Sequence, residues 1–416
     1  MKALQFNVTT GRFVAAKILG SIFGSRVFYA GPAKTLQITD IDEPGLPSPD
    51  WAKIRTRYCG FCGSDLNLIR LHDSPTASPF TSFPCVMGHE ITGRITETGL
   101  HVRDFTPGER VVIVPALGCE TRGISPLCPS CRAGRASNCE NFAEGSLPPG
   151  MFTGINRAIN GGFAPYVVAH KSQMFRVPEG LSDTAAVMTE PAAVALQAVF
   201  ENPPRPGEKV LVVGGGVIGN LIVQALRVLT PDCRISVIEP SDFAASLARD
   251  MGADEVIAPG RVTEQISRIT GARSYKPMLG PEILMGGFAR IFDTVAGSAT
   301  LNMSLRALAA MGTLSMVGIG ANIKIDPTPL WLKLQTVQGA YGYGMVTHQG
   351  ERRHAFAIAL ELMHNGKIRA EPLVTHRFAL ENFREMIAVN LDKARHRAMK
   401  TVVSFGEAEA GQPQPL

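Results

Sequence analysis

A glycine-rich stretch behind a short apolar run constrains the fold of this chain most strongly. The run Val210–Val213 has the composition of a buried strand, and Asn220–Leu229 has that of an apolar helix. Between them, Gly214, Gly216 and Gly219 form the spacing G-x-G-x-x-G. Glycines at this spacing let the backbone turn tightly and approach a pyrophosphate, whose charge meets the helix N-terminus. The order of strand, glycine turn and helix predicts a dinucleotide-binding unit, with the cofactor against Gly214, Gly216, Val217, Ile218 and Gly219.

A carboxylate after the next strand indicates which dinucleotide binds. The strand Arg234–Ile238 ends at Glu239, twenty residues after Gly219. A carboxylate at this place hydrogen-bonds the ribose hydroxyls and repels a 2′-phosphate. Positions 240–244 contain no basic residue. We therefore expect NAD in preference to NADP.

Strands and helices continue to alternate after Glu239, which predicts a doubly wound parallel sheet. Its later strands, 290–295 and 313–317, end in loops at Val295 and Gly318. Because ligands of such sheets bind beyond the carboxyl ends of the strands, we expect Val295 and Gly318 to face the cofactor.

Three separate stretches carry side chains that suit a catalytic metal. Cys62-Gly-Ser-Asp65 supplies a thiol, a hydroxyl and a carboxylate, and Gly88-His-Glu90 supplies an imidazole and a carboxylate. Glu190 precedes Pro191, which suits the first position of a helix and would leave Glu190 just outside it. Zinc binds sulfur, nitrogen and oxygen ligands, and a catalytic zinc keeps one position open. This mixed donor set predicts a catalytic zinc rather than a closed structural one.

These motifs, in this order, resemble the medium-chain, zinc-dependent alcohol dehydrogenase family. The stretch Glu190-Pro-Ala-Ala-Val-Ala-Leu-Gln197 is most similar to the sorbitol and threonine dehydrogenase branch. The resemblance extends from about Leu36 to Ser404. It implies an α/β protein with a GroES-like, β-rich catalytic domain and a Rossmann domain built on a doubly wound parallel sheet.

The resemblance also implies roles for individual residues. Cys62 and His89 bind the catalytic zinc, and the third ligand is either Glu90 or Glu190, an alternative that stays open. In the family, a basic residue at the position of Lys400 approaches the cofactor pyrophosphate. An ordinary exposed lysine is the alternative for Lys400.

The proton is expected to leave through the first turn after Cys62. Ser64 accepts the proton of the alcohol, whereas Asp65 holds His89 in orientation. Many relatives have a histidine where this chain has Asn67. Because Asn67 cannot titrate, the exit must use water, a ribose hydroxyl or another residue such as His72.

A second group of cysteines lies between residues 119 and 139. Cys128-Pro-Ser-Cys131 and Cys139 follow Cys119. The family has a structural zinc held by four cysteines, the first normally three residues before the second. Here Ser125 occupies that place, with Thr121–Leu127 inserted after Cys119. We expect Cys119, Cys128, Cys131 and Cys139 to bind a structural zinc; a group of three cysteines without metal is the alternative.

The resemblance divides the chain into domains. We expect the catalytic domain at residues 1–188, with 341–416 returning to it, the Rossmann domain at 189–340, and a loose tail at 406–416. An amphipathic helix is expected at 348–365.

Two segments depart from the family. Residues 271–288 are expected to form a surface loop. In residues 12–30, Val14, Ile18 and Ile22 recur at helical spacing. We expect this helix to pack on its own domain or on a neighbouring subunit. Because Arg12, Lys17 and Arg26 accompany it, attachment to a membrane surface is the alternative.

Composition excludes several classes of partner. The chain of 416 residues has a net charge of +5 without a block of like charge, so nucleic acid is not expected as a partner. No run reaches the roughly 18 apolar residues of a membrane span. The start of the chain lacks the apolar centre of a secretory signal, and the eight cysteines suit metal ligation better than disulfides, so we expect a cytoplasmic protein.

Together these features predict a zinc-dependent oxidoreductase that transfers a hydride from a secondary alcohol, polyol or amino alcohol to NAD. By resemblance, the chain forms a homodimer or homotetramer. Two other functions are considered: an aldehyde-oxidising or dismutating relative with tightly held NAD, and a dinucleotide-binding protein without catalysis. Retention of Cys62, Ser64 and His89 argues against the last of these.

Overall fold

The structure is a computed structural model that describes residues 1–31 and 33–406. The tail expected at 406–416 therefore lies outside the described residues, apart from Gly406. The chain divides into two compact units. Unit 1 contains Met1–Glu190, Tyr343–His364 and the described residues from Ala370 onward, and unit 2 contains Pro191–Gly342 and Asn365–Arg369. The expected divisions, at 188/189 and 340/341, each lie two residues before those of the structure.

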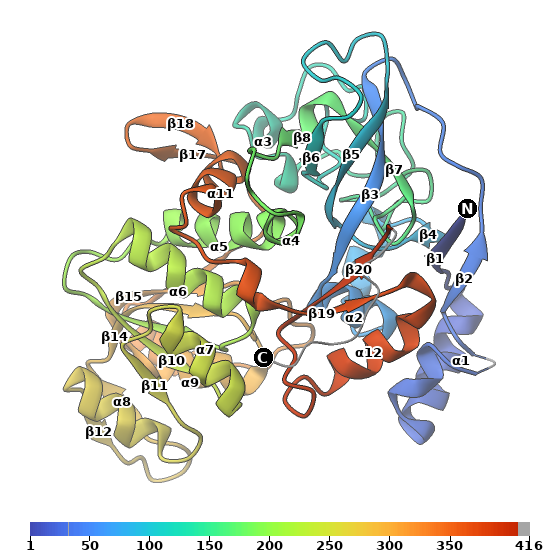
Figure 1. Ribbon diagram of the computed structural model, residues 1–416. Coiled ribbons are helices and arrows are strands. Elements are labelled where there is room, and N and C mark those ends of the chain that lie inside the picture. The colour runs from blue at the N-terminus through green and yellow to red at the C-terminus, as the bar shows by residue number, and fades with distance from the viewer. Residues whose placement is uncertain (32, 407–416) are drawn as a thin grey trace. The chain divides into compact units, whose positions relative to one another are not determined.

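Unit 1 is built mainly from β-strands (Figure 1). Its largest sheet has the order β19-β20-β3-β5-β6-β8, and β7 also pairs with β3. A smaller sheet has the order β2-β1-β4, and β17 pairs with β18. The strands are β1 (Lys2–Phe6), β2 (Leu36–Asp40), β3 (Trp51–Phe61), β4 (Cys85–Val86), β5 (Glu90–Thr98), β6 (Arg110–Ile113), β7 (Tyr166–His170), β8 (Met174–Arg176), β17 (Met345–His348), β18 (Glu351–His354), β19 (Val374–Phe378) and β20 (Lys400–Ser404).

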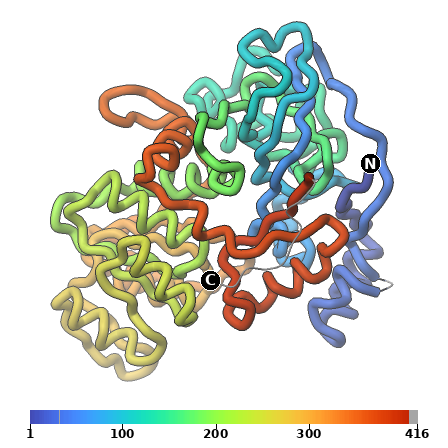
Figure 2. The backbone as a smooth tube through the Cα atoms, viewed as in Figure 1, coloured from blue at the N-terminus to red at the C-terminus, as the bar shows by residue number. Residues whose placement is uncertain are grey.

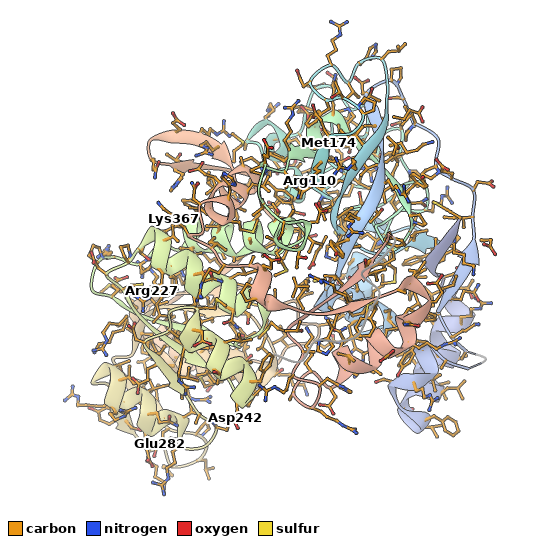
Figure 3. The ribbon with its side chains drawn as sticks, in the orientation of Figure 1. Arg110, Met174, Arg227, Asp242, Glu282 and Lys367 are labelled. Carbon is orange, nitrogen blue, oxygen red and sulfur yellow. The ribbon has the colours of Figure 1, made fainter. Side chains whose placement is uncertain are left out.

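The C-terminal part of the chain completes this large sheet. In Figure 2 the red strand β20 runs beside the blue strand β3, and the two pair antiparallel with Thr401 opposite Phe61. Arg110 of β6 and Met174 of β8, both labelled in Figure 3, lie on neighbouring strands. Side chains from both ends of the chain meet in the core, where Leu4, Ile54 and Val403 are fully buried.

Short helices connect the strands of unit 1. They are α1 (Thr10–Phe23), α2 (Gly63–Ile69), α3 (Pro129–Arg132), α4 (Asp183–Ala186), α11 (Ala355–His364) and α12 (Phe383–Leu391), with the 3₁₀ turns η1 (Ser25–Phe28), η2 (Pro75–Phe80), η3 (Ala136–Asn138), η4 (Lys171–Gln173), η5 (Glu371–Leu373) and η6 (Leu380–Asn382). The helix α5 (Thr189–Glu201) begins with the last two residues of unit 1 and continues in unit 2.

Unit 2 is a doubly wound sheet with the strand order β11-β10-β9-β14-β15-β16. All neighbouring strands run parallel. Numbered within the unit, this is the order 3-2-1-4-5-6 of a dinucleotide-binding fold. Its elements are β9 (Lys209–Val213), α6 (Val217–Leu229), β10 (Arg234–Ile238), α7 (Asp242–Asp250), β11 (Glu255–Ile257), α8 (Val262–Thr270), β14 (Phe288–Asp293), α9 (Ser298–Ala307), β15 (Leu308–Met316), α10 (Thr328–Leu332) and β16 (Thr336–Gly339). The predicted α/β fold class is confirmed.

Residues 271–288 were expected to form a surface loop, and they are largely exposed, but they contain a β-hairpin that the sequence did not predict. Its strands are β12 (Arg273–Tyr275) and β13 (Ile283–Met285). Across the hairpin, the Ser274 hydroxyl donates to Glu282, labelled in Figure 3, at 2.6 Å. Half of the prolines and glycines in this segment, Pro277, Gly280 and Pro281, lie in the turn that joins the two strands, and the others lie outside the hairpin.

The helix expected at 348–365 was also partly wrong. His348 ends β17, Glu351–His354 form β18, and only Ala355–His364 are helical. The charged run Glu351-Arg-Arg353 offers no apolar residue that could continue a helical face, and it pairs as a strand instead. Most of α11 is buried, so the helix is not amphipathic.

The next residues, Asn365–Arg369, belong to unit 2, although they were expected in the catalytic domain. The Arg369 N–H donates to Gln224 Oε1 at 2.7 Å, and its guanidinium donates to the Asp250 carbonyl.

Within residues 1–31 and 33–406, no helix combines the length and the apolar character that crossing a bilayer requires.

Candidate active site

Cys62 lies at the turn between β3 and α2. Its N–H donates to Asp65 Oδ2 at 2.9 Å, so the carboxylate satisfies a backbone donor at the start of the helix. This bond fixes Asp65, which is 5% exposed, beneath the turn. The predicted residues Cys62 and Asp65 are therefore held together by the local backbone.

His89 and Glu90 lie where the chain enters β5. Glu90 is the first residue of β5 and lies opposite Gly60 of β3. A Cβ at Gly60 would lie 1.9 Å from Glu90 Oε2, so only glycine leaves room for this carboxylate. Pairing of β3 with β5 therefore brings His89 and Glu90 beside Cys62, which follows β3.

The donor atoms of Cys62, His89 and Glu90 lie within 4.8 Å of one another. We call this group the catalytic cluster. One sulfur, one nitrogen and one oxygen at this spacing fit a tetrahedral zinc, whose ligands bind at about 2.0–2.3 Å and leave the fourth position open. His89 and Glu90 are only 6% and 1% exposed, so the cluster is largely shielded from bulk water.

Asp65 controls the charge of His89. The His89 Nδ1 and Asp65 Oδ1 atoms are 3.6 Å apart. Burial lowers the pKa of His89, but the Asp65 carboxylate and the Cys62 sulfur outweigh burial and raise it well above its usual range. A carboxylate beside a ligating histidine typically fixes the orientation of the ring.

Lys400 is buried against Glu90, so the alternative of an ordinary exposed lysine was wrong. Lys400 is 3% exposed, and its ammonium pairs with the Glu90 carboxylate and donates to the Phe61 carbonyl at 3.2 Å. Burial lowers the pKa of Lys400, but Glu90 and Cys62 outweigh this effect and the pKa is raised. Because a carboxylate has about four lone-pair sites, the ion pair leaves Glu90 able to bind a metal.

Glu190 lies next to the catalytic cluster without belonging to it. Burial and the nearby Glu90 raise the pKa of Glu190 to about 7, although His89, Lys400 and a hydrogen bond with Tyr343 oppose the shift. The helix begins at Thr189, so the expectation that Glu190 lies outside it was wrong. Pro191 is tolerated as the third helical residue because the first N–H groups of a helix have no partner inside it.

The expected proton path follows α2. Ser64 and Asn67 are half-buried on this helix, and the Asn67 carbonyl accepts from the His72 N–H at 2.8 Å.

Asp73, which the sequence did not single out, lies near Asp65. Burial and the Asp65 charge raise the pKa of Asp73 to about 6. A single aspartate in a loop rich in serine, threonine and proline carries no pattern that would have identified it.

The four cysteines of the second group also converge. Their sulfur atoms all lie within 4.8 Å of one another, with Cys119 and Cys139 3.6 Å apart and Cys128 and Cys139 3.9 Å apart. Sulfurs bound to one tetrahedral zinc are about 3.8 Å apart. Four thiols at this spacing fit a closed structural zinc, and the alternative of only three gathered cysteines was wrong.

Backbone N–H groups point at these sulfurs. The Cys131 N–H donates to Cys128 Sγ at 3.4 Å, and the Asn141 N–H donates to Cys139 Sγ at 3.3 Å. Burial raises the pKa of the Cys128 thiol, but N–H donors from Glu140 and Cys131 outweigh burial and lower it to about 7. The loop therefore favours the thiolate at Cys128, whereas burial raises the pKa of Cys131 and raises that of Cys139 to about 11.

Arg122 explains how a longer loop still closes around the group. It is fully buried and donates five hydrogen bonds of 2.6–3.1 Å to backbone carbonyls, those of Leu117, Glu144, Leu147, Pro148 and Gly150. We call residues 117–150 the cysteine lobe. The sequence indicated the insertion of Thr121–Leu127 but not the arginine that holds it, because all five acceptors are carbonyls that any residue supplies.

The glycine turn of unit 2 has the geometry that its spacing predicted. Gly214 has a φ of +94°, and Gly216 precedes α6 as its N-cap. A Cβ at Gly219 would lie 1.9 Å from the Gly214 carbonyl oxygen. Gly214 and Gly219 are therefore required for the close approach of α6 to the turn after β9.

Glu239 is held by this turn. Its Oε2 accepts from the Gly215 N–H at 2.7 Å and its Oε1 from the Ser241 N–H at 2.8 Å. The carboxylate follows β10 and so lies beside the glycine turn, where an adenosine ribose is bound in such folds.

Val295 and Gly318 follow β14 and β15 at the same end of the sheet. A Cβ at Gly318 would lie 2.6 Å from the Val295 carbonyl carbon, so the two loops touch. Thr294, which the sequence did not indicate, donates to the Val213 carbonyl at 2.8 Å and joins β14 to the end of β9. The reversal of strand order between β9 and β14 is where dinucleotides bind in this fold.

Two family models match the chain. The alcohol dehydrogenase GroES-like domain matches residues 48–179, and the zinc-binding dehydrogenase domain matches residues 217–365. The first match lies in unit 1 and contains Cys62, His89 and the cysteine lobe. The second begins at the N-terminus of α6 and includes the later strands of the parallel sheet.

Characterised relatives and solved structures agree with these matches. The chain is 28% identical to L-idonate 5-dehydrogenase of Vitis vinifera, over 83% of this chain and 85% of the relative. It is 28% identical to sorbitol dehydrogenase of Arabidopsis thaliana, over 80% and 83%. The crystal structure of 2R,3R-butanediol dehydrogenase from Bacillus subtilis matches with a TM-score of 0.69 and 25% identity, covering 89% of this chain and 96% of that one.

Proposed function

The chain belongs to the zinc-dependent medium-chain dehydrogenase family, and on this premise we propose that it oxidises a secondary alcohol, a polyol or an amino alcohol with NAD. The observation that carries the proposal is the catalytic cluster, in which donor atoms of Cys62, His89 and Glu90 lie within 4.8 Å. The polyol and diol dehydrogenases named above support this substrate class.

When bound, the zinc supplies a Lewis acid that lowers the pKa of an alcohol hydroxyl, and NAD supplies the hydride acceptor. The chain's own residues then manage orientation and the proton. Asp65, held by the Cys62 N–H, keeps the imidazole of His89 in place. The Ser64 hydroxyl on α2 accepts the proton of the substrate, and Asn67 leaves its onward transfer to water or to neighbours such as His72.

Glu90 is proposed as the third metal ligand, since its carboxylate completes the cluster. Glu190 acts as a second carboxylate that exchanges with Glu90 or holds a proton. Lys400 holds the Glu90 carboxylate in place through their buried ion pair, and Lys400 is further proposed to approach the cofactor pyrophosphate. Zinc-edge X-ray absorption should lose one oxygen neighbour in Glu90→Ala and keep it in Glu190→Ala; the reverse pattern would assign the ligand to Glu190.

The preference for NAD rests on Glu239. Its carboxylate is fixed by two backbone N–H groups and would meet a 2′-phosphate with like charge. The turn residues Gly214, Gly216, Val217, Ile218 and Gly219 are proposed to hold the pyrophosphate, with Val295 and Gly318 beside the rest of the cofactor.

A spectrophotometric panel tests the function. The purified protein is supplied with a polyol, a vicinal diol, a β-hydroxy amino acid and a primary alcohol, each with NAD and with NADP. We expect NADH formation with at least one of the first three and a rate with NADP at least about tenfold lower. Ser64→Ala should reduce turnover while leaving zinc content unchanged. Absence of reduced cofactor with all substrates would contradict the proposal.

We further propose a homodimer or homotetramer in the cytoplasm. β16 is the last strand in its sheet order, and Trp331, Leu334 and Val337 on and before it are 64%, 74% and 39% exposed. An apolar sheet edge of this kind suits pairing with a second copy. Sedimentation velocity tests the assembly: Leu334→Lys should shift the protein to a smaller species, and an unchanged sedimentation coefficient would exclude this edge.

The proposed cytoplasmic location is supported by the cysteines. All eight are free, which suits a reducing compartment.

A further inference from the structure

The helix α1 is held on unit 1 by one of its faces. Ala16 is fully buried and Phe13 packs against the core of the unit. Gly20 lies under the ring of Phe28 from the following turn, so close that a Cβ would sit 2.6 Å from the ring. The face formed by Phe13, Ala16 and Gly20 therefore fixes the helix in place.

The opposite face of α1 is apolar and exposed. Val14, Ile18 and Ile22 are 53%, 57% and 66% exposed. At about 100° per residue, these three side chains form one stripe that points away from Ala16 and Gly20. We call this stripe the outer face of α1. Contiguous exposed apolar side chains commonly mark an interaction site, so the outer face is expected to have a partner.

The charges around α1 indicate an anionic partner. Residues 1–39 contain five basic side chains and no acidic one, which equals the entire net charge of +5 of the chain. By the same helical geometry, Arg12 and Lys17 flank the outer face on its two sides. Arg26 follows in η1. Apolar side chains between basic ones are typical of helices that lie in the headgroup region of a membrane.

A second copy of the chain fits the outer face less well. A symmetric contact would pack α1 against α1 of the other copy, and the helix has no acidic residue that could pair with Arg12 or Lys17. The helix of 14 residues is about 21 Å long and about 10 Å wide, so it covers roughly 200 Å². Stable protein interfaces bury about 800 Å² on each partner.

We propose that the outer face of α1 binds the surface of a bilayer that contains anionic phospholipid. Val14, Ile18 and Ile22 enter the boundary between headgroups and acyl chains, while Arg12 and Lys17 contact lipid phosphates. This attachment is peripheral, since α1 is too short to cross the bilayer. The proposal does not depend on the proposed catalytic function.

Flotation with lipid vesicles tests the proposal on the full chain. Vesicles of phosphatidylcholine alone are compared with vesicles of equal parts phosphatidylcholine and phosphatidylglycerol. We expect the protein to float with the anionic vesicles, and to float less as salt is raised. Ile22→Glu should weaken this binding by about tenfold or more, because it removes an inserted side chain and adds a negative charge.

Two further variants isolate apolar insertion from charge. Leu100→Glu makes the same kind of change at a turn of unit 1 outside α1, where Leu100 is 87% exposed, and it should leave binding unchanged. Arg12→Gln should weaken binding to anionic vesicles by about fivefold, as expected for one charge near the surface. Circular dichroism should be the same for all four proteins, because the substituted side chains are exposed.

Three results would overturn the proposal. The first is no flotation of the wild-type protein with anionic vesicles. The second is equal loss of binding in Ile22→Glu and Leu100→Glu. The third is a wild-type oligomer that Ile22→Glu dissociates in sedimentation velocity, which would assign the outer face to a second copy of the chain.

Discussion

The catalytic cluster and the cysteine lobe gather metal-ligand side chains in the same unit by different means. In the cysteine lobe, all four sulfurs lie between Cys119 and Cys139, and backbone N–H groups of the loop point at them. In the catalytic cluster, Cys62 comes from the end of β3 and His89 and Glu90 from the start of β5, and the immediate neighbours are ionisable side chains.

This difference separates a structural centre from a reactive one. Four thiolates fill a tetrahedral zinc and leave no position for a substrate. The catalytic cluster offers three donors. Asp65 raises the pKa of His89, and Lys400 forms an ion pair with Glu90. The pKa of Glu190, which lies beside them, is itself raised to about 7. We therefore expect substitutions in the cysteine lobe to change stability, and substitutions around the catalytic cluster to change zinc affinity, turnover or pH dependence.

The largest effect on stability is expected from Cys128→Ser. Loss of one thiolate should release the structural zinc, lower the free energy of unfolding by about 4 kcal/mol or more, and leave turnover of the folded fraction nearly unchanged. Chemical denaturation, metal analysis and turnover check this. Cys85→Ser, at a buried thiol outside both groups, is the control and should keep both zinc ions. A variant as stable as wild type would mean that the cysteine lobe needs no metal.

A buried histidine beside the cysteine lobe, His354, should make the stability of the protein depend on pH. The Tyr343 backbone carbonyl accepts from the Ser137 hydroxyl of the lobe at 3.0 Å, and the His354 ring packs beside the Tyr343 ring. Burial lowers the pKa of His354 to about 4 from its usual 6.5. Between these values the unfolded chain binds a proton that the folded chain does not, so the free energy of unfolding falls as pH falls, by about 3 kcal/mol in total.

Replacing the titrating ring tests this pH dependence. Denaturation of wild type and His354→Phe is compared at about pH 7 and about pH 4.5. The variant should lose less stability than wild type over this range, because it has no proton to bind at this position. Parallel losses in the two proteins would show that His354 titrates normally.

A smaller effect, on metal affinity, is expected from Asp65→Asn. Without its carboxylate, the His89 ring loses its orienting partner, and zinc affinity at the catalytic cluster should fall about 10–100-fold. Competition with a chelator measures this change. Asp73→Asn alters a carboxylate near Asp65 that touches no proposed ligand, and it should leave zinc affinity unchanged. Equal losses in the two variants would indicate a general effect of charge.

The smallest effect is expected from Asn67→His. A titrating ring on α2 should add a route for the proton, shifting the pH–rate profile while zinc content stays the same. Asn67→Ala is the control, since it changes size without adding a titrating group. If both profiles match that of wild type, no proton passes through this position.

Local patterns made much of this molecule predictable from sequence. The glycine spacing at Gly214–Gly219 requires close backbone contacts that only glycine permits, so it indicated the parallel sheet and the turn after β9. Cys128 and Cys131 belong to one short turn, and their spacing alone indicated a metal site. In both cases neighbouring residues determine the geometry.

Features that depend on distant contacts were not predictable in the same way. Lys400 meets Glu90 across 310 positions of sequence, and only the pairing of β20 with β3 and of β3 with β5 brings them together. Arg122 binds carbonyl groups, which every residue has. The helical spacing of α1 was predicted, but the face formed by Val14, Ile18 and Ile22 is exposed, and the opposite face packs on the core instead. Such choices are decided by tertiary packing rather than by local preference.

The central claim is that Cys62, His89 and a carboxylate hold a zinc ion on which turnover depends, and Cys62→Ser tests it most directly. Zinc content, NADH formation and thermal unfolding are measured on the same preparations of wild type and variant. We predict that the variant loses one of two zinc ions per chain and about a thousandfold or more of turnover, while its unfolding temperature stays close to that of wild type. Full turnover in the variant, or active wild-type protein without zinc, would contradict the claim.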